Sequence, residues 1–201
     1  IVISGNDATS ATAAQLNTIN NATLLEVDAN AVTGLSGSYS NLVTLYESSG
    51  VRGLNDEDIS ISGEITVAQA NIIDAFTSGV ITASIVTTET VDSLKTLTGT
   101  NNAYTIVISE TSASASDLNA INGLTTATVD LTNVASVTSS ALSDLDTLAD
   151  AINAIPAQFI NATNLATSAV SDSEIDITSS AGIIDSLDAI DADSTDMTMS
   201  S

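Results

Sequence analysis

Carboxylates are the side chains of this chain whose number and spacing could support chemistry. The 201 residues include 25 Asp and Glu but only two basic residues, Arg52 and Lys95, and no His or Cys. A Ser–His–Asp triad, a Cys/His zinc site and a disulfide scaffold are therefore excluded. Asp144, Asp146 and Asp150, on or beside one helical segment, are the candidates for acid–base catalysis. They stand among Ser and Thr rather than in apolar surroundings that raise a pKa, so we expect a protein that is not an enzyme.

Calcium binding is the chemistry that the acidic residues fit better. Ca²⁺ takes hard oxygen ligands, which Asp and Asn supply when they stand at short spacings in turns. Three clusters have this character, and their expected ligands are Asp56 and Asp58; Asp172 and Asp176; and Asp191, Asp193 and Asp196. The last cluster opens as Asp-x-Asp but lacks the Gly and the closing Glu of an EF-hand. The alternative interpretation is that these acids are solvated turn residues that keep an Ala-rich surface soluble.

The charge balance restricts the partners. The formal net charge is −23 and the pI about 4.1, so electrostatic binding to nucleic acid or anionic lipid is disfavoured. No apolar run reaches the roughly 18 residues that cross a bilayer, which argues against membrane insertion. A mean hydropathy of +0.31 predicts a packed core rather than disorder. The chain opens in a strand-like segment without a basic and apolar leader, so we expect a mature chain or a piece of a larger one.

Internal repeats carry the strongest structural signal. The tetrapeptide at Ile1–Ser4 recurs at Ile106–Ser109, and a close variant stands at Ile59–Ser62. After the first two, by about ten residues, and after the variant comes a segment whose apolar residues recur at spacings of three and four, which predicts a short helix. These segments are 13–20, 67–76 and 115–122, with a further one at 181–190. The Ser and Thr residues just before them suit helix N-caps: Ser10, Thr12, Thr66, Ser114 and Ser179.

Each predicted helix, apart from the one at 181–190, is followed by a β-branched or alternating run and then by a second helical segment. The runs are 23–28, 80–86 and 127–131, and the second helical segments lie around 39–45, 91–97 and 142–148. Strands are therefore expected to start near Ile1, Thr23, Ile59, Val80, Tyr104, Ala127 and Glu174. Many of the steps between them fall near 21–24 residues.

A βα unit of this length cannot bury its own apolar face and must stack on its neighbours. The predicted fold is a mixed α/β repeat, an elongated solenoid-like array of short parallel strands and short helices. It forms a single array over 1–201, with approximate repeats 1–58, 59–103, 104–157 and 158–201. The alternative is a more compact α/β domain whose repeats arise from low complexity.

The segment Ile65–Ile85, ITVAQANIIDAFTSGVITASI, resembles the tandem repeats of very large bacterial surface proteins. Such repeats occur in secreted S-layer-like and adhesin-like proteins, notably those of cyanobacteria. The resemblance is best over Ile59–Leu97 and weak beyond Ile152. It implies an extracellular structural or adhesive role, often with calcium, and it carries no catalytic residues.

These observations predict a secreted structural protein of the cell surface that assembles with copies of itself into a filament or surface layer. Ile1–Ser4 is expected to pair with a strand of another copy or of a neighbouring repeat, near Asp176–Thr178 or Met197–Met199. Because like charges repel, calcium or salt should strengthen the assembly. The alternative function is that of an adhesin segment, which would bind a glycan or protein ligand as a stable monomer.

Overall fold

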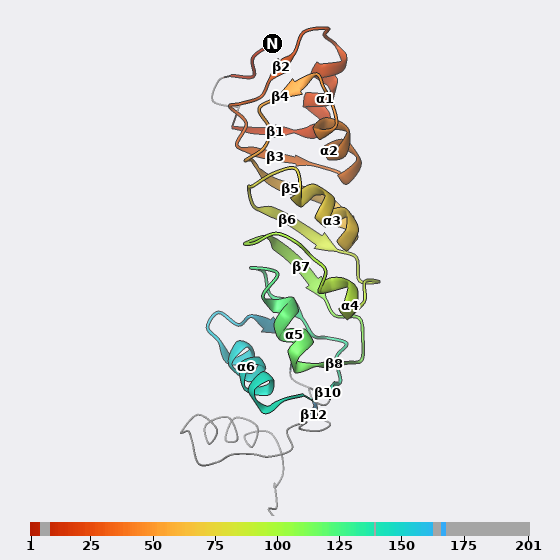
Figure 1. Cartoon of the computed structure of the whole chain (residues 1–201), viewed down its shortest axis with the longest axis vertical. Coiled ribbons are helices and arrows are strands. Elements are labelled where there is room, and N and C mark those ends of the chain that lie inside the picture. Colours follow the sequence, from red (N-terminus) through yellow and green to blue (C-terminus); the bar gives the residue numbers. More distant parts are fainter. Residues whose placement is uncertain (5–8, 139, 163–165, 168–201) are drawn as a thin grey trace, which may run out of the picture.

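The chain folds into an elongated stack of strands and helices. The structure is a computed structural model that describes residues 1–4, 9–138, 140–162 and 166–167. Figure 1 shows the strands lying across the long axis and following one another along it. The mixed α/β class and the parallel pairing predicted from the repeats are confirmed.

A parallel sheet of seven strands runs along this stack, and its strands are neighbours in chain order. They are β1 (Ser10–Thr12), β3 (Gly34–Gly37), β5 (Asp58–Ile65), β6 (Ile81–Ile85), β7 (Ala103–Val107), β9 (Val129–Asp130) and β11 (Phe159–Ile160). Ser10 pairs with Gly34, and Gly34 pairs with Asp58, so each of these steps advances the chain by 24 residues. The step is 21 residues from Thr82 to Ala103 and 30 from Val129 to Phe159.

Two smaller parallel sheets accompany the main one. One contains β8 (Ser112–Ser114), β10 (Ser136–Thr138) and β12 (Ala166–Thr167), and the other pairs β2 (Val27–Asp28) with β4 (Val51–Arg52). An isolated parallel bridge also joins Val2 to Asp28. A main-sheet strand is thus often joined to a second short strand within the same turn of the repeat.

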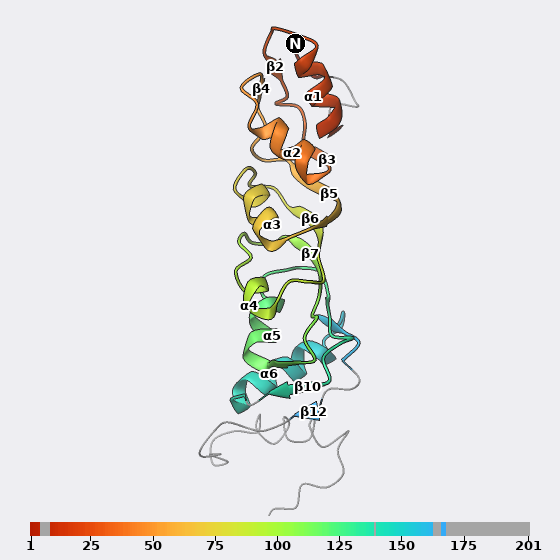
Figure 2. The same ribbon diagram turned by 90° about the vertical axis from the view of Figure 1, so that its right-hand side faces the viewer.

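One helix follows each of the first six main-sheet strands. The helices are α1 (Ala13–Asn21), α2 (Tyr39–Tyr46), α3 (Val67–Asp74), α4 (Val91–Leu94), α5 (Ala115–Asn122) and α6 (Leu142–Asn153). In Figure 2, α3, α4 and α5 lie along one side of the stack and β6 and β7 along the other. We call a main-sheet strand, together with the residues up to the end of the following helix, a unit. The longest described step between paired strands contains α6, so the extra residues are accommodated partly by a longer helix.

The helices begin where hydroxyl side chains cap them. Thr12, Thr66 and Ser114 each accept a hydrogen bond from the backbone N–H three residues later, as predicted. Thr12 and Thr66 complete capping boxes with Gln15 and Gln69. Of the other predicted caps, Ser10 lies in β1 instead, and Ser179 is outside the described residues.

One aliphatic core runs through the stack. Side chains from Ala13 in the first unit to Phe159 in β11 form a single buried cluster. In β5 the alternation is clear, because Ile59 and Ile61 are buried while Ser60 is exposed. None of the helices in the described part of the chain is long and apolar enough to cross a membrane.

Some predicted strand positions were wrong. Residues 23–26 are not a strand, and Leu24 and Leu25 in that stretch are exposed. The segment at Ile1 contributes only the bridge between Val2 and Asp28. The strands β3, β8 and β10 were not predicted, and the strand expected at Glu174 lies outside the described residues.

Candidate functional site

The first predicted calcium cluster is the turn that leads into β5. Asp56 and Asp58 are exposed, whereas Glu57 between them is fully buried. Oδ1 of Asp58 accepts a hydrogen bond from the backbone N–H of Val80 at 2.8 Å. Within the described residues, no three acidic side chains come close enough to hold a metal ion together. Calcium binding at Asp56 and Asp58 therefore stays a prediction, and it would need backbone carbonyls, water or a second molecule as further ligands.

The other predicted calcium ligands lie beyond the described part of the chain. They are Asp172 and Asp176 of the second cluster and Asp191, Asp193 and Asp196 of the third.

Glu57 has the most unusual environment among the described acids. Burial raises the pKa of its carboxyl, while hydrogen bonds from the backbone of Glu57, Asp56 and Asn55 oppose that rise. Oε2 accepts from the N–H of Asp56 at 3.3 Å, but Oε1 has no partner. The carboxyl is closed to solvent, so it organises the turn and is not accessible to a substrate. Sequence could have singled it out, because Glu57 is in phase with the inward-facing Ile59 and Ile61.

The acids considered for catalysis all lie on α6. Asp144 is in the first turn of that helix, and its backbone carbonyl accepts a hydrogen bond from Nδ2 of Asn119. Asp150 is exposed near the other end of the helix. This arrangement offers no enclosed pair of carboxyls with unequal surroundings, which is what a general acid and base require.

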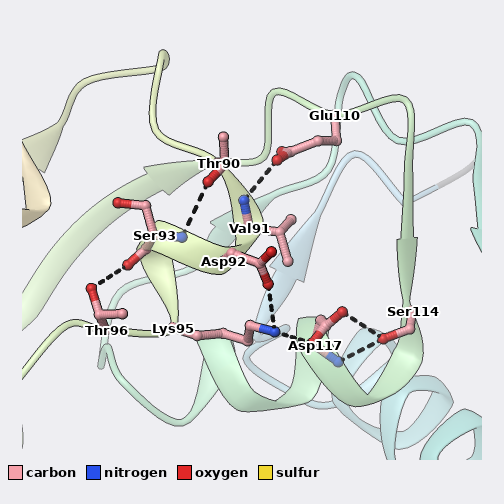
Figure 3. Close-up of polar contacts among 9 residues, drawn as sticks. All are labelled: Thr90, Val91, Asp92, Ser93, Lys95, Thr96, Glu110, Ser114 and Asp117. Carbon is pink, nitrogen blue, oxygen red and sulfur yellow. Dashed lines mark hydrogen bonds and ion pairs between the residues drawn. The ribbon is translucent and has the colours of Figure 1, made fainter.

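Both basic side chains of the chain form ion pairs. Arg52 in β4 contacts Glu26 and Asp28, each at 2.7 Å. Lys95, just after α4, contacts Asp92 at 2.9 Å and Asp117 of α5 at 2.6 Å. In Figure 3 the ammonium group of Lys95 lies between the two carboxylates. The remaining acidic surface therefore keeps its charge without a cation of the same chain to neutralise it.

The Lys95 cluster is built as a clasp between units. The hydrogen bond that Lys95 donates to Asp117, and a second one to Asp92, hold the pKa of the lysine above its usual value. The bond from Lys95, supported by one from the hydroxyl of Ser114, holds the pKa of Asp117 below its usual value. A nucleophilic or basic lysine needs a lowered pKa instead, so this geometry favours a structural role.

Side chains from one unit also accept the first backbone N–H of the helix before it. The N–H of Val67 donates to Oε1 of Glu89 at 2.9 Å, and that of Val91 donates to Oε1 of Glu110 at 2.7 Å. Figure 3 shows the second of these bonds. Ser140 accepts from the first N–H of α5 in the same way. These contacts satisfy donors that a helix leaves unpaired, and they tie consecutive units together.

An apolar hollow lies at the N-terminal end of the stack, beside α1 in Figure 1. Its volume is about 540 Å³, and it is lined by Ile3, Ser10, Ala11, Ala14, Gln15, Leu16, Thr18 and Ile19. None of these residues is charged, which is unusual for a chain of net charge −23. The exposed side chains of Ile1, Val2, Leu24 and Leu25 add apolar surface in the same first units. Apolar surface of this kind marks an interaction site more often than a bare surface.

A backbone edge is open at the same end. Among the described strands β1 pairs only with β3. Thr9 directs its carbonyl toward that side, where it accepts from the N–H of Gly34 at 2.9 Å. Because successive residues of a strand alternate in direction, Ser10 presents its own N–H and C=O to the open edge.

Two adjoining polar hollows lie near the other end of the described stack. Their volumes are about 430 and 250 Å³, and both are lined by Asn122 and Gln158. Asn122 donates a hydrogen bond to Gln158 between them. Thr147 and Asp150 line the smaller hollow, which provides oxygen acceptors for the hydroxyl groups of a neutral ligand.

Comparison with known proteins gives no relative for this arrangement: no protein-family model, no curated protein and no solved structure matches the chain.

Proposed function

We propose that this chain is a segment of a βα solenoid with a structural, non-enzymatic role outside the cell. The observation that carries the proposal is the uninterrupted succession of parallel strands, each paired with the next in chain order. A continuous aliphatic core supports it, because each unit buries its apolar face only against its neighbours. The resemblance to repeats of bacterial surface proteins supports secretion to the cell surface.

Self-assembly into a filament or surface layer follows from how such a stack ends. A stack of parallel strands leaves an unpaired backbone edge at its ends, and such an edge pairs readily with another strand. At the N-terminal end this edge stands beside an uncharged apolar hollow. An end-to-end contact between unlike faces does not close on itself and therefore produces a filament.

Charge makes this assembly dependent on ions. The net charge of −23 opposes close approach of two copies, and salt screens charges separated by more than about 10 Å at 0.1 M. Calcium adds oxygen coordination to screening, and exposed acids such as Asp56 and Asp58 are available for it. Calcium is therefore the cofactor we propose, as a link between acidic surfaces.

Sedimentation velocity and negative-stain imaging of the purified chain test the proposal. We expect polymers that grow with protein concentration, grow further when NaCl is added, and grow most with CaCl₂ at the same ionic strength. A chelator should return the calcium-dependent part to smaller species. A chain that stays monomeric at high concentration under all of these conditions would contradict the proposal.

The alternative function, an adhesin segment, is favoured by the polar hollows around Asn122 and Gln158. They combine amide, hydroxyl and carboxylate groups without any cation, which suits a neutral saccharide better than an anionic one. In the same experiments, a stable monomer that binds neutral oligosaccharides would support the adhesin in place of the filament.

A further inference from the structure

The contacts between neighbouring units have a direction. Nδ2 of Asn17 in α1 donates to the backbone carbonyl of Asn41 in α2 at 2.9 Å. Asn119 in α5 bonds in the same way to the carbonyl of Asp144 in α6 at 2.8 Å. In both pairs the asparagine is the fifth residue of its helix and the acceptor is the third residue of the next. The N-terminal unit is the donor each time.

The first backbone N–H groups of the helices have the same direction. Those of α3 and α4 donate to Glu89 and Glu110, which stand in the chain just before the next helix. For these contacts a unit has a donor side, which faces its C-terminal neighbour, and an acceptor side, which faces its N-terminal neighbour. The open end at α1 is an acceptor side.

Resting on the proposed function, we infer that a second copy of this chain occupies the open end with the donor side of one of its units. The open end consists of the β1 edge, the hollow and the outer face of α1. It continues the interface that β1 forms with β3 and β3 forms with β5. A unit of the same kind therefore fits it in strand direction and spacing.

Association is consequently head-to-tail. Two copies that met through their open ends would bring two acceptor sides together, without the helix donors found between units inside the chain. The hollow has no charged lining residue, so a second chain of the same negative sign can approach it with less repulsion than elsewhere.

This inference moves the docking edge from where the sequence placed it. Ile1–Ser4 was expected to pair with another copy, but one edge of this segment is occupied within the chain. The N–H of Ile3 donates to the carbonyl of Asp28 at 2.9 Å, and the N–H of Asp28 donates to the carbonyl of Ile1 at 2.7 Å. β1, eight residues further on, has the open edge beside the hollow.

The substitution Ala14→Glu tests the docking face. Ala14 is exposed, lines the hollow and is the second residue of α1. A glutamate is favourable to the helix at this position, because it stands near the positive end of the helix dipole. We expect unchanged circular dichroism and melting, but at least a tenfold rise in the protein concentration at which half of the chain is assembled.

Ala68→Glu is the matched control. Ala68 is the exposed second residue of α3, follows the capping residue Thr66, and is far from the hollow. It adds the same charge at the same helix position, so it should assemble like the native chain. Equal effects of the two substitutions, or assembly that Ala14→Glu leaves unchanged, would overturn the inference while the proposed function stands. A native chain that never assembles would overturn both.

Orientation is tested with Ala14→Cys, because the chain has no other cysteine. Head-to-tail contacts keep these thiols apart, so we expect assemblies that yield monomers on a non-reducing gel after mild oxidation. Disulfide-linked dimers recovered in high yield from the assemblies would show open ends facing each other and would overturn the head-to-tail arrangement.

Discussion

The acidic residues of this chain divide by what their oxygens accept. Glu89 and Glu110 accept from helix N–H groups of the preceding unit, and Asp117 holds Lys95. Glu57 accepts from its own turn inside the protein. The exposed acids keep the solvent-facing charge, so some carboxylates here organise the backbone while the rest determine how copies approach one another.

The buried carboxyl gives a prediction for Glu57→Gln. Because burial raises its folded-state pKa, the stabilising contribution of the protonated form is complete below the unfolded value of about 4.3. That contribution is lost as the pH rises through the folded-state pKa. Glutamine imitates the protonated form, so the variant should be more stable than the native chain at pH 7 by on the order of 1 kcal/mol.

Urea unfolding at pH 7 and at pH 3.5 measures this difference, which should nearly vanish at the lower pH. Asp56→Asn, at the exposed neighbouring position, is the control and should show no comparable gain. A Glu57→Gln variant that is less stable at pH 7 would mean that the ionised carboxylate is required, and it would contradict the assignment.

Each helix of the stack depends on the unit that follows as well as on its own cap. α3 begins at the hydroxyl of Thr66, yet its first N–H bonds to Glu89 from the following unit. Glu89 also accepts from the hydroxyl of Ser93 in α4. One side chain therefore joins two helices, and its removal should weaken both.

Glu89→Ala should lower the free energy of unfolding by about 1 kcal/mol, the usual cost of a lost helix cap. Glu89→Gln keeps an acceptor oxygen and should recover most of that loss. Glu64→Ala removes an exposed acid of β5 and should change stability by less than about 0.5 kcal/mol. Urea unfolding followed by circular dichroism compares the three, and equal losses for Glu89→Ala and Glu64→Ala would refute the capping role.

Sequence predicted the helices well because their signals are local. The segment 115–122 was predicted as observed, and Thr12, Thr66 and Ser114 cap the helices that follow them. It missed strands such as β3 and β8, whose Gly- and Ser-rich sequences have no β-branched run and which form because neighbouring strands pair with them.

The candidate site was predicted only in outline. Self-association at the N-terminal end was inferred from the apolar residues Ile1–Ile3, but β1 has a weakly apolar sequence that gave no signal. The pairing of Ile3 with Asp28 depends on a contact across 25 residues, which no local pattern contains. The turn at Glu57 looked like a cluster of ligands because alternation along a strand was not extended into it.

At the scale of the whole molecule, stability is expected to vary along the stack. β5, β6 and β7 have paired neighbours on both sides, whereas β1 has one among the described strands. In a linear stack, a unit at an open end is held by one interface instead of two and opens more easily.

Hydrogen–deuterium exchange measured by mass spectrometry should show this gradient. In the monomer, amides of β1 and α1 should exchange at least about tenfold faster than those of β5 and β6. Upon assembly, protection should rise at β1 and α1 and stay constant in β5. Uniform protection along the monomer, or a rise confined to β5, would contradict the linear arrangement.

The step between paired strands makes the chain a ruler. Each added unit lengthens the stack by one strand spacing, about 4.8 Å, whether the step contains 21 residues, as from Thr82 to Ala103, or 30, as from Val129 to Phe159. Since every unit meets its neighbours through the same parallel edges, a duplication or loss of one unit changes the reach of the protein and leaves the remaining contacts as they were. A gene for such a protein can therefore adjust the distance it spans in equal increments, by recombination between its own repeats.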